Sequence, residues 1–535
     1  MEKVTAIVIG GGATGVGILR DLAMRGVDAM LIEQRDLAHG TSSRYHGLLH
    51  SGARYAVKDA EAGRECIEEN TILRRIGRHC VEATEGFFVR TVEDPEDFEA
   101  KWVEGCKNCG ISAVQISVEE ALRLEPNLSP KIKAVYRVPD AAIDGFRMVW
   151  QNVASARRYG AKVRTYTEVV RINSTNGQVT GVTVRDYFTG KEENIACDFV
   201  ISAVGSWAGE LAAKAGLQVG VQPDKGTLIA FNHRIASRVI NRLHQASDGD
   251  IFVPHGSITI LGTTSMAADK ADDTEPSVEE VKKLLNIGRV LFENIDDYRI
   301  LRAFTGTRPL YSADPNAKGR GASRGFVTLD HAHDGLKGFI SIVGGKFTTY
   351  RLMAEKAVDM VCEYLGNKTP CRTAEENIVE DPSEALMGRA KKFFPVHGAS
   401  LAASRLGAEG LSRVVDKLEK QPSSRQLVCE CENVTLAEVE EAAADSTSFT
   451  LSDVRRKTRM GMGTCQGAFC TYRTVGTMVA NGLTNGQDSK ELLKDFIEAR
   501  WKGIRHVLWG NAIRETELTR GIYEGTLNVN GAMKK

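Results

Sequence analysis

The stretch VTAIVIGGGATG, residues 4–15, decides the fold that we expect for this chain. A short run rich in β-branched residues ends in glycines and is followed by apolar residues at helical spacing, which predicts strand, turn and helix in that order. Gly10, Gly12 and Gly15 leave room for a phosphate to approach the amides at the helix N-terminus. The helix should end at Gly26, and a second strand should lead to Glu33. The sequence therefore predicts a βαβ unit that binds a dinucleotide, with Glu33 accepting hydrogen bonds from a ribose.

The composition is that of a folded protein of several domains. The chain has 535 residues, of which 42% are apolar and 26% charged, and 69 Lys plus Arg balance 69 Asp plus Glu. Zero net charge argues against a polyanionic partner such as nucleic acid. No apolar stretch is long enough to span a bilayer, and no export signal is recognisable. Eleven Cys at low density favour a reducing cytoplasm over a disulfide scaffold.

Later segments predict that the dinucleotide fold is discontinuous. Residues 169–203 suggest strands joined by Asn-Gly and Thr-Gly turns, and residues 227–264 suggest antiparallel strands inserted between pieces of the first layer. This arrangement favours FAD over NAD. Residues 344–355 predict a second glycine turn running into a helix, whose positive end could stabilise negative charge on a reduced isoalloxazine. An ordinary turn with a capping Thr is the alternative.

Four motifs carry a family resemblance. They are AHGTSSR (38–44), HGLLHSGARY (46–55), GTRPL (306–310) and the segment 344–355. Together they resemble the FAD-dependent glycerol-3-phosphate dehydrogenases, and within that family the anaerobic bacterial A subunits. The resemblance implies an α/β protein with α+β elements. It would have a discontinuous Rossmann-like FAD-binding domain of the glutathione-reductase/D-amino-acid-oxidase type, an inserted antiparallel-sheet substrate domain and a small C-terminal helical [2Fe-2S] domain.

The expected domain boundaries follow from this arrangement. Residues 1–370 should form the FAD-dependent oxidoreductase region, with FAD-binding pieces at about 1–90, 140–225 and 320–370 and substrate-domain pieces at about 91–139 and 226–319. Beyond it we expect a helical connector (371–425), the [2Fe-2S]-binding domain (426–482) and a C-terminal helical cap (483–535).

The resemblance also implies the active-site residues. The expected reaction is hydride transfer from C2 of sn-glycerol 3-phosphate to FAD, giving dihydroxyacetone phosphate. Substrate binding is assigned to Arg54, Tyr55, Arg308 and Lys346, and catalysis to His50, Arg54, Arg308 and Lys346. Cofactor binding is assigned to Gly10, Gly12, Gly15, Glu33, Thr41, Ser42, His46, Gly205, Gly344, Gly345 and Thr348. The base could be a His, a Lys of lowered pKa or water. We rank His50 first; His46, His233 and His255 are the other histidines considered.

Four of the eleven Cys lie close together near the C-terminus. Cys429 and Cys431 form CxC, and Cys465 and Cys470 form CxxxxC. This spacing suits a [2Fe-2S] cluster and resembles the bacterioferritin-associated ferredoxin domain. Structural zinc is the alternative, although zinc sites favour CxxC knuckles. A capping box at residues 435–438 predicts a helix after the first pair. The basic run 455–457 suggests a solvated helix face or a surface that steers an acidic partner.

A flavin joined to an iron–sulfur domain implies that electrons leave through protein partners. The resemblance implies a flavoprotein partner (the B subunit), a membrane-anchoring iron–sulfur partner (the C subunit), menaquinone as indirect acceptor, and a peripheral location on the cytoplasmic face of the inner membrane. FMN is possible in the complex. Two alternatives stay open at this point: an amino acid or opine dehydrogenase on the same fold, and a non-catalytic electron-transfer or iron-handling protein.

Overall fold

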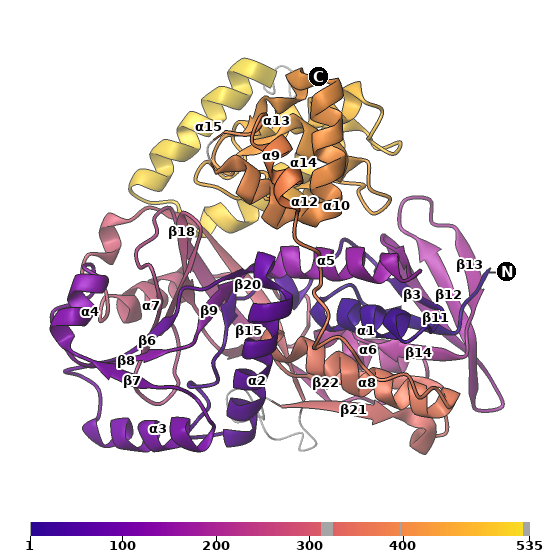
Figure 1. Cartoon of the computed structure of the whole chain (residues 1–535), viewed down its shortest axis with the longest axis horizontal. Helices are drawn as coiled ribbons and strands as arrows, with labels where there is room; N and C mark the ends of the chain where they lie inside the picture. The colour runs from indigo at the N-terminus through magenta and orange to yellow at the C-terminus, as the bar shows by residue number, and fades with distance from the viewer. Residues whose placement is uncertain (1, 312–324, 396, 528–535) are drawn as a thin grey trace.

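The computed structural model describes residues 2–311, 325–395 and 397–527, and it contains the predicted N-terminal βαβ unit (Figure 1). Strand β2 (Ala6–Ile9) leads into helix α1 (Ala13–Met24), which is followed by β3 (Ala29–Ile32), parallel to β2. Alternate residues of β2 face opposite sides of the sheet. Ala6 and Val8 pack under helices, whereas Ile7 and Ile9 pack against a second sheet. Burial on both faces explains the unbroken apolar run of the sequence.

This unit belongs to a six-stranded sheet in the order β10-β3-β2-β14-β22-β21. All neighbours are parallel except β21 and β22. The added strands are β10 (Lys162–Arg164), β14 (Phe199–Ser202), β21 (Phe326–Asp330) and β22 (Phe339–Gly344). One face is covered by α1, α5 (Gly145–Arg158) and α8 (Tyr350–Leu365). The other is covered by the meander β11 (Thr167–Thr175), β12 (Gln178–Asp186) and β13 (Glu192–Ala196), which β1 (Glu2–Lys3) extends.

A second, nine-stranded sheet is built from two separate stretches of the chain. The first stretch supplies β6 (Gly86–Thr91), β7 (Val114–Ile116) and β8 (Ile132–Val138). The second supplies β15 (Val221–Phe231), β16 (Val239–Arg242), β17 (Ile251–His255), β18 (Ile258–Gly262), β19 (Met266–Ala267) and β20 (Ile300–Tyr311). Helices α3 (Glu96–Asn108), α4 (Val118–Leu124) and α7 (Val278–Gly288) pack on it. The predicted boundary at residues 319/320 lies outside the described residues.

Shorter elements join the two sheets. Strands β4 (Leu48–Leu49), β9 (Ala141–Ile143) and β5 (Val81–Glu82) form a three-stranded sheet in that order. Helix α2 (Ala60–Ile76) follows β4 along the chain, and helix α6 (Ala208–Ala213) follows β14. Strand β20 contacts both β15 and β22, so it carries residues of the second sheet to the edge of the first.

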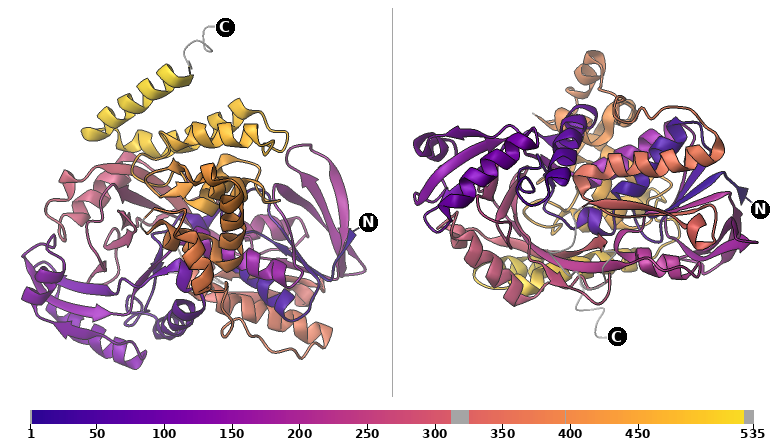
Figure 2. Two further views of the ribbon diagram at one scale, coloured as in Figure 1. Left: turned by 45° about the horizontal axis from the view of Figure 1, so that its top comes forward. Right: turned by 90° about the horizontal axis from the view of Figure 1, so that it is seen from below.

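The C-terminal part is mainly helical and has its own core. Its elements are α9 (Glu384–Ala390), α10 (Gly398–Lys420), β23 (Leu427–Cys429), β24 (Val434–Thr435), α11 (Leu436–Ala443), α12 (Leu451–Thr458), α13 (Cys470–Ala480), α14 (Ser489–Ile504) and α15 (Asn511–Leu527). The predicted capping box is present, because Thr435 and Glu438 bond each other's backbone at the start of α11. Figure 2 shows that these helices gather on one side of the molecule.

Helix α12 corrects the prediction of a solvated basic face at residues 455–457. Lys457 is buried, and its Nζ donates to Asp445 Oδ1 at 2.8 Å and to Ser448 Oγ at 2.6 Å. Arg456 forms an ion pair with Asp36 of the N-terminal part. Beyond the end of α12, Arg459 pairs with Asp144 at 2.8 Å. Tertiary packing against the N-terminal part therefore determines where this run points.

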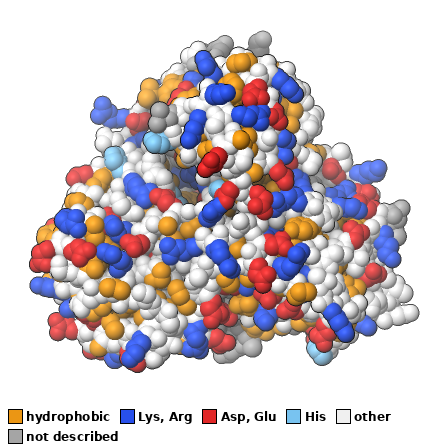
Figure 3. Space-filling model, viewed as in Figure 1, with side chains coloured by type: hydrophobic (Ala, Val, Ile, Leu, Met, Phe, Trp, Pro, Cys, Tyr) orange, Lys and Arg blue, Asp and Glu red, His pale blue; other side chains and the backbone are white. Residues whose placement is uncertain are grey.

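The surface is evenly charged. Figure 3 shows acidic and basic side chains interspersed over the visible face, as expected from the balanced composition. Within the described residues, we find no helix that combines the length and apolarity needed to cross a membrane.

Candidate active site and cysteine centre

The turn between β2 and α1 requires glycine at two of the predicted positions. Gly10 has φ +111°, and a Cβ there would lie 2.7 Å from the Ala203 carbonyl oxygen. A Cβ on Gly15 would lie 1.9 Å from the Gly10 carbonyl oxygen. Gly12 is the N-cap of α1, and the amide of Ala13 donates to Ser42 Oγ at 2.9 Å. The turn thus brings backbone close to the cavity at a helix N-terminus, which suits an anionic ligand.

Glu33 lies just beyond β3, and its side chain is hydrogen-bonded to the backbone of this turn. Its two carboxylate oxygens accept the amides of Gly11 at 2.7 Å and Arg35 at 2.8 Å. Burial is the largest influence on this carboxyl group and raises its pKa, while these amides oppose the rise. Glu33 therefore holds the glycine turn in shape as well as lining the cavity beside it.

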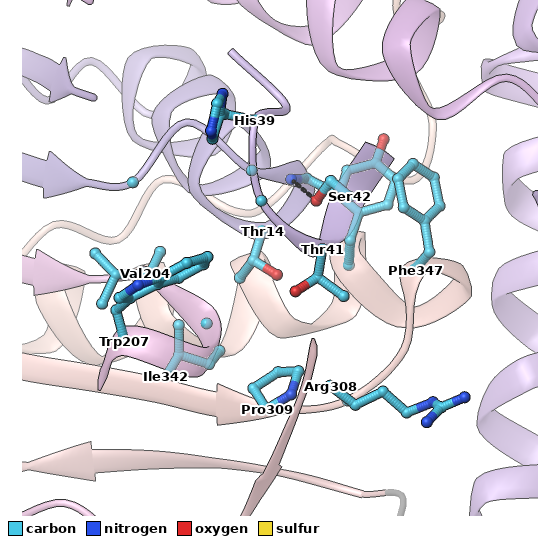
Figure 4. Close-up of a pocket in the computed structure, with 18 of the residues that line it drawn as sticks. Thr14, His39, Thr41, Ser42, Val204, Trp207, Arg308, Pro309, Ile342 and Phe347 are labelled. Atoms are coloured by element: carbon cyan, nitrogen blue, oxygen red, sulfur yellow. Dashed lines mark hydrogen bonds between the residues drawn. The ribbon is translucent and has the colours of Figure 1, made fainter. Parts of the chain in front are cut away.

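A cavity of about 580 Å³ runs from this turn to the second predicted glycine turn (Figure 4). Most of the predicted residues line it: Gly10, Gly12, Glu33, Thr41, Ser42, His46, His50, Tyr55, Gly205, Arg308, Gly344, Gly345 and Lys346. Gly15, Arg54 and Thr348 are not among the lining residues. Trp207, Asp272 and Met353 line the cavity but were missed by sequence reasoning, because no local motif marks them.

The second glycine turn connects β22 to α8. Gly344 and Gly345 have φ +88° and +75°, and a Cβ on Gly345 would lie 2.4 Å from Met353 Sδ. Lys346 follows, with its Nζ 4.9 Å from the centre of the Tyr55 ring. Thr348 does not face the cavity but accepts the backbone amide of His50 at 3.1 Å. The turn therefore fixes Lys346 and His50 at the same end of the cavity.

Two of the four candidate histidines lie in the cavity wall. His46 and His50 stand edge to face with ring centres 5.6 Å apart. Burial, together with the nearby charges of Arg54 and Arg308, lowers the pKa of His46 to about 3, so this ring is neutral at physiological pH. His255 lies behind His46, within hydrogen-bonding distance of its carbonyl oxygen at 2.9 Å, and His233 is exposed. Of the candidates, only His46 and His50 line the cavity.

Arg54 and Arg308 each have a buried aspartate partner. Arg54 Nη2 lies 2.6 Å from Asp250 Oδ1 and donates to the Ser247 carbonyl oxygen at 3.1 Å. Arg308 pairs with Asp224, which faces it across β15 and β20, and donates to the Thr264 carbonyl oxygen at 3.0 Å. Despite burial, the pKa of Asp250 lies below its usual range because Arg54 and His244 stabilise its charge. Arg308 reaches the cavity, whereas Arg54 is held beside it.

The four predicted cluster cysteines come together as two pairs. The thiol of Cys429 is hydrogen-bonded to Cys470, which lowers the pKa of Cys429 to about 7. Cys431 contacts Cys465, whose pKa is raised by burial and by Cys431. Among the described residues, His, Cys, Asp and Glu side chains form no group of three or more that would hold a metal ion. Two cysteine pairs match a [2Fe-2S] cluster, in which each of two irons takes two thiolates.

The surroundings of the cysteines fit such a group. A Cβ on Gly463 would lie 2.4 Å from Cys431 Cβ, so only glycine fits there. Cys429 and Cys470 are buried, Cys465 is half-buried and Cys431 is exposed. One pair therefore faces the interior and the other reaches the surface.

Comparisons with known proteins match both sites. The family model for FAD dependent oxidoreductases matches residues 5–351, and the model for the BFD-like [2Fe-2S] binding domain matches residues 427–476. The A subunit of the anaerobic glycerol-3-phosphate dehydrogenase of Escherichia coli K12 is 43% identical over 99% of this chain and 97% of its own length. The corresponding A1 subunit of Haloferax volcanii is 41% identical over 98% of this chain and 90% of its own length.

Solved structures share the fold. The FAD-complexed glycerol-3-phosphate dehydrogenase of Bacillus halodurans has a TM-score of 0.69 at 21% identity, covering 95% of this chain and 96% of its own. The glycine oxidase of Geobacillus kaustophilus has a TM-score of 0.56 at 19% identity, covering 68% and 95%. At these identities the likeness concerns the fold alone.

Proposed function

Because this chain belongs to the FAD-dependent oxidoreductases and, within them, to the family of anaerobic glycerol-3-phosphate dehydrogenase A subunits, we propose that it oxidises sn-glycerol 3-phosphate to dihydroxyacetone phosphate. The matches confirm the predicted fold class and the presence of an FAD-dependent oxidoreductase domain and a C-terminal [2Fe-2S]-binding domain, whose bounds stay predictions. The zinc alternative loses its support for the same reason.

One observation carries the proposal. The cations Arg308 and Lys346 line the same cavity as the glycine turn at residues 10–15, so an anionic substrate and a dinucleotide can share it. Arg offers a planar fork of donors and Lys a compact charge, and both suit a phosphate dianion. We assign the substrate phosphate to these two side chains. Arg54 is paired with Asp250 and does not line the cavity, but it contributes positive charge close to it.

The chain's own residues then position the alcohol and take its proton. When bound, FAD supplies the acceptor for a hydride from C2, and the iron–sulfur cluster passes electrons on singly. We assign His50 as the base for the C2 hydroxyl. It lies 8% exposed at the cavity wall, with its backbone fixed by Thr348 and its ring 5.4 Å from that of Tyr55. A buried base in a fixed position meets the first requirement of proton transfer, which is geometry.

Electrons should leave the chain on the side of the exposed pair. Cys431 is exposed, and Phe469, next to Cys470, is 39% exposed. We propose that a partner protein docks here, in a complex whose flavoprotein B subunit and iron–sulfur C subunit deliver electrons to menaquinone at the inner membrane. The relatives' designation as A subunits supports an assembly of several different chains. FMN, if part of the complex, is assigned to no residue of this chain.

An anaerobic titration tests the function. Glycerol 3-phosphate should bleach the flavin absorbance of the purified chain and then produce the EPR signal of the reduced cluster. Bleaching by amino acids but not by glycerol 3-phosphate would favour the amino acid or opine dehydrogenase. Bleaching by dithionite alone would favour a non-catalytic electron-transfer protein.

A further inference from the structure

Four arginines converge where the C-terminal part meets the rest of the chain. They are Arg44, Arg302, Arg455 and Arg500. Arg302 lies on β20, and its guanidinium packs on α14, where a Cβ on Gly503 would lie 2.8 Å from Arg302 Nε. Arg455 lies on α12 and Arg500 on α14. Four segments far apart in sequence thus place like charges next to one another.

Three of these guanidinium groups are incompletely satisfied by the protein around them. Within the described part of the chain, Nε of Arg302, of Arg455 and of Arg500 is closed to solvent and has no hydrogen-bond partner. Burial, with the charges of Arg455, Arg500 and Arg44, lowers the pKa of Arg302 to about 9. Asp272 is the acid that acts on Arg44. The four side chains are half-buried, and bringing like charges together there is costly, so an anion nearby would stabilise the group.

The row of arginines extends from the flavin cavity to the cysteines. Arg44 follows Ser42 and precedes Tyr45, both of which line the cavity. At the other end, Arg500 donates to the Cys465 carbonyl oxygen at 3.3 Å, and the side chains of Cys465 and Cys470 act electrostatically on Arg500. Cys470 also acts on Arg455. Arg455 and Arg500 therefore lie beside the cysteine centre.

We propose that Arg302, Arg455 and Arg500, continued by Arg44 to the flavin cavity, form a cationic bridge that stabilises the reduced iron–sulfur cluster and so draws electrons from the flavin. A cluster held by four thiolates is an anion, and reduction adds one more negative charge. Nearby cations favour the more negative state, which raises the reduction potential of the cluster. This effect on the reduction potential requires the cluster, but it does not depend on which substrate the chain oxidises.

A dithionite titration followed by EPR measures this effect without any substrate. In Arg302→Gln and in Arg455→Gln, the ratio of reduced to oxidised cluster at a fixed potential should fall about tenfold, equivalent to about 59 mV for one electron. Arg302→Lys keeps the charge and should stay near the wild-type value. Arg389→Gln removes an exposed charge on α9 that is paired with Glu419 and should also leave the potential unchanged. Equal potentials in wild type, Arg302→Gln and Arg455→Gln would overturn the proposal.

Thermal unfolding of the cluster-free chain provides a second readout, which applies even if a variant fails to retain iron. Without the cluster, Arg302 lies among the like charges of Arg44, Arg455 and Arg500, so Arg302→Gln should unfold at a higher temperature than wild type. With the cluster bound, this increase in the unfolding temperature of Arg302→Gln should vanish or reverse. A cluster-free Arg302→Gln chain that is less stable than the cluster-free wild type would show that protein contacts alone hold this arginine, which would refute the bridge.

Discussion

Replacing Arg308 by methionine should weaken substrate binding and folding through two separable effects. The change removes a cation from the cavity wall and leaves Asp224, which is 2% exposed, without its ion-pair partner. A hydrogen bond to a charged group contributes about 1.5–3 kcal/mol, so kcat/KM for glycerol 3-phosphate should fall about 10- to 150-fold. Breaking a buried pair costs about 3–5 kcal/mol, and since the Arg308 side chain is 22% exposed, about 3 kcal/mol of unfolding free energy is expected.

The double variant Arg308→Met/Asp224→Asn separates the two effects. Asparagine keeps the shape of Asp224 and can still bond Ser265, whose hydroxyl donates to Asp224 Oδ1 at 2.8 Å. The unfolding free energy, measured by urea denaturation, should recover most of the loss, whereas kcat/KM should not. Recovery of kcat/KM in the double variant would refute a direct contact between Arg308 and the substrate phosphate.

Four further outcomes are expected. In His50→Gln, the rate of flavin bleaching by glycerol 3-phosphate should fall about 10²- to 10⁴-fold in stopped flow, and an unchanged rate would exclude His50 as the base. Gly10→Ala, whose Cβ would meet the Ala203 carbonyl oxygen at 2.7 Å, should bind FAD about 5- to 150-fold more weakly. Gly26→Ala, with φ +76° but open space around the added Cβ, should leave FAD affinity unchanged in the same fluorescence titration. Cys431→Ser should lose iron, measured as iron per protein, while keeping FAD; full iron content would contradict the ligand assignment. The pKa of His46 is about 3 in the folded chain, below its unfolded value, so the unfolded state binds the extra proton and wild-type stability falls as pH drops below about 6.5. In His46→Gln the unfolding free energy should fall less steeply with decreasing pH, by up to about 1.4 kcal/mol per pH unit. Urea denaturation that gives the same slope for both chains would contradict the lowered pKa.

The exposure of the cysteines supports the direction that we propose for electron flow. Cys429 and Cys470 are buried, whereas Cys431 is exposed. Arg500 contacts the cysteine centre at the carbonyl oxygen of Cys465, and we propose that a partner docks beside the exposed Cys431. We propose that electrons pass from the flavin cavity to the cysteine centre and leave the chain beside Cys431.

The local sequence determined those elements that depend on contacts between residues close together in the sequence. Gly15 is required by the turn's own backbone, because a Cβ there would meet the Gly10 carbonyl oxygen, whereas Gly10 is also required by the distant Ala203. Glu33 follows from the same unit, and the capping box at Thr435 depends on residues three positions apart. The cysteine spacing likewise indicated the cluster domain that the family match confirms.

Only the tertiary structure decided which charges meet. The partners of Arg54 and Arg308, Asp250 and Asp224, are 196 and 84 positions away in the sequence, and no pattern marks them. The basic run at residues 455–457 looked like a solvated face, yet packing of α12 against the N-terminal part buried Lys457 and brought Arg455 to Arg302. Electrostatic interactions depend on distance in space and on exclusion of water, and both are set by how the sheets and helices pack rather than by the order of residues.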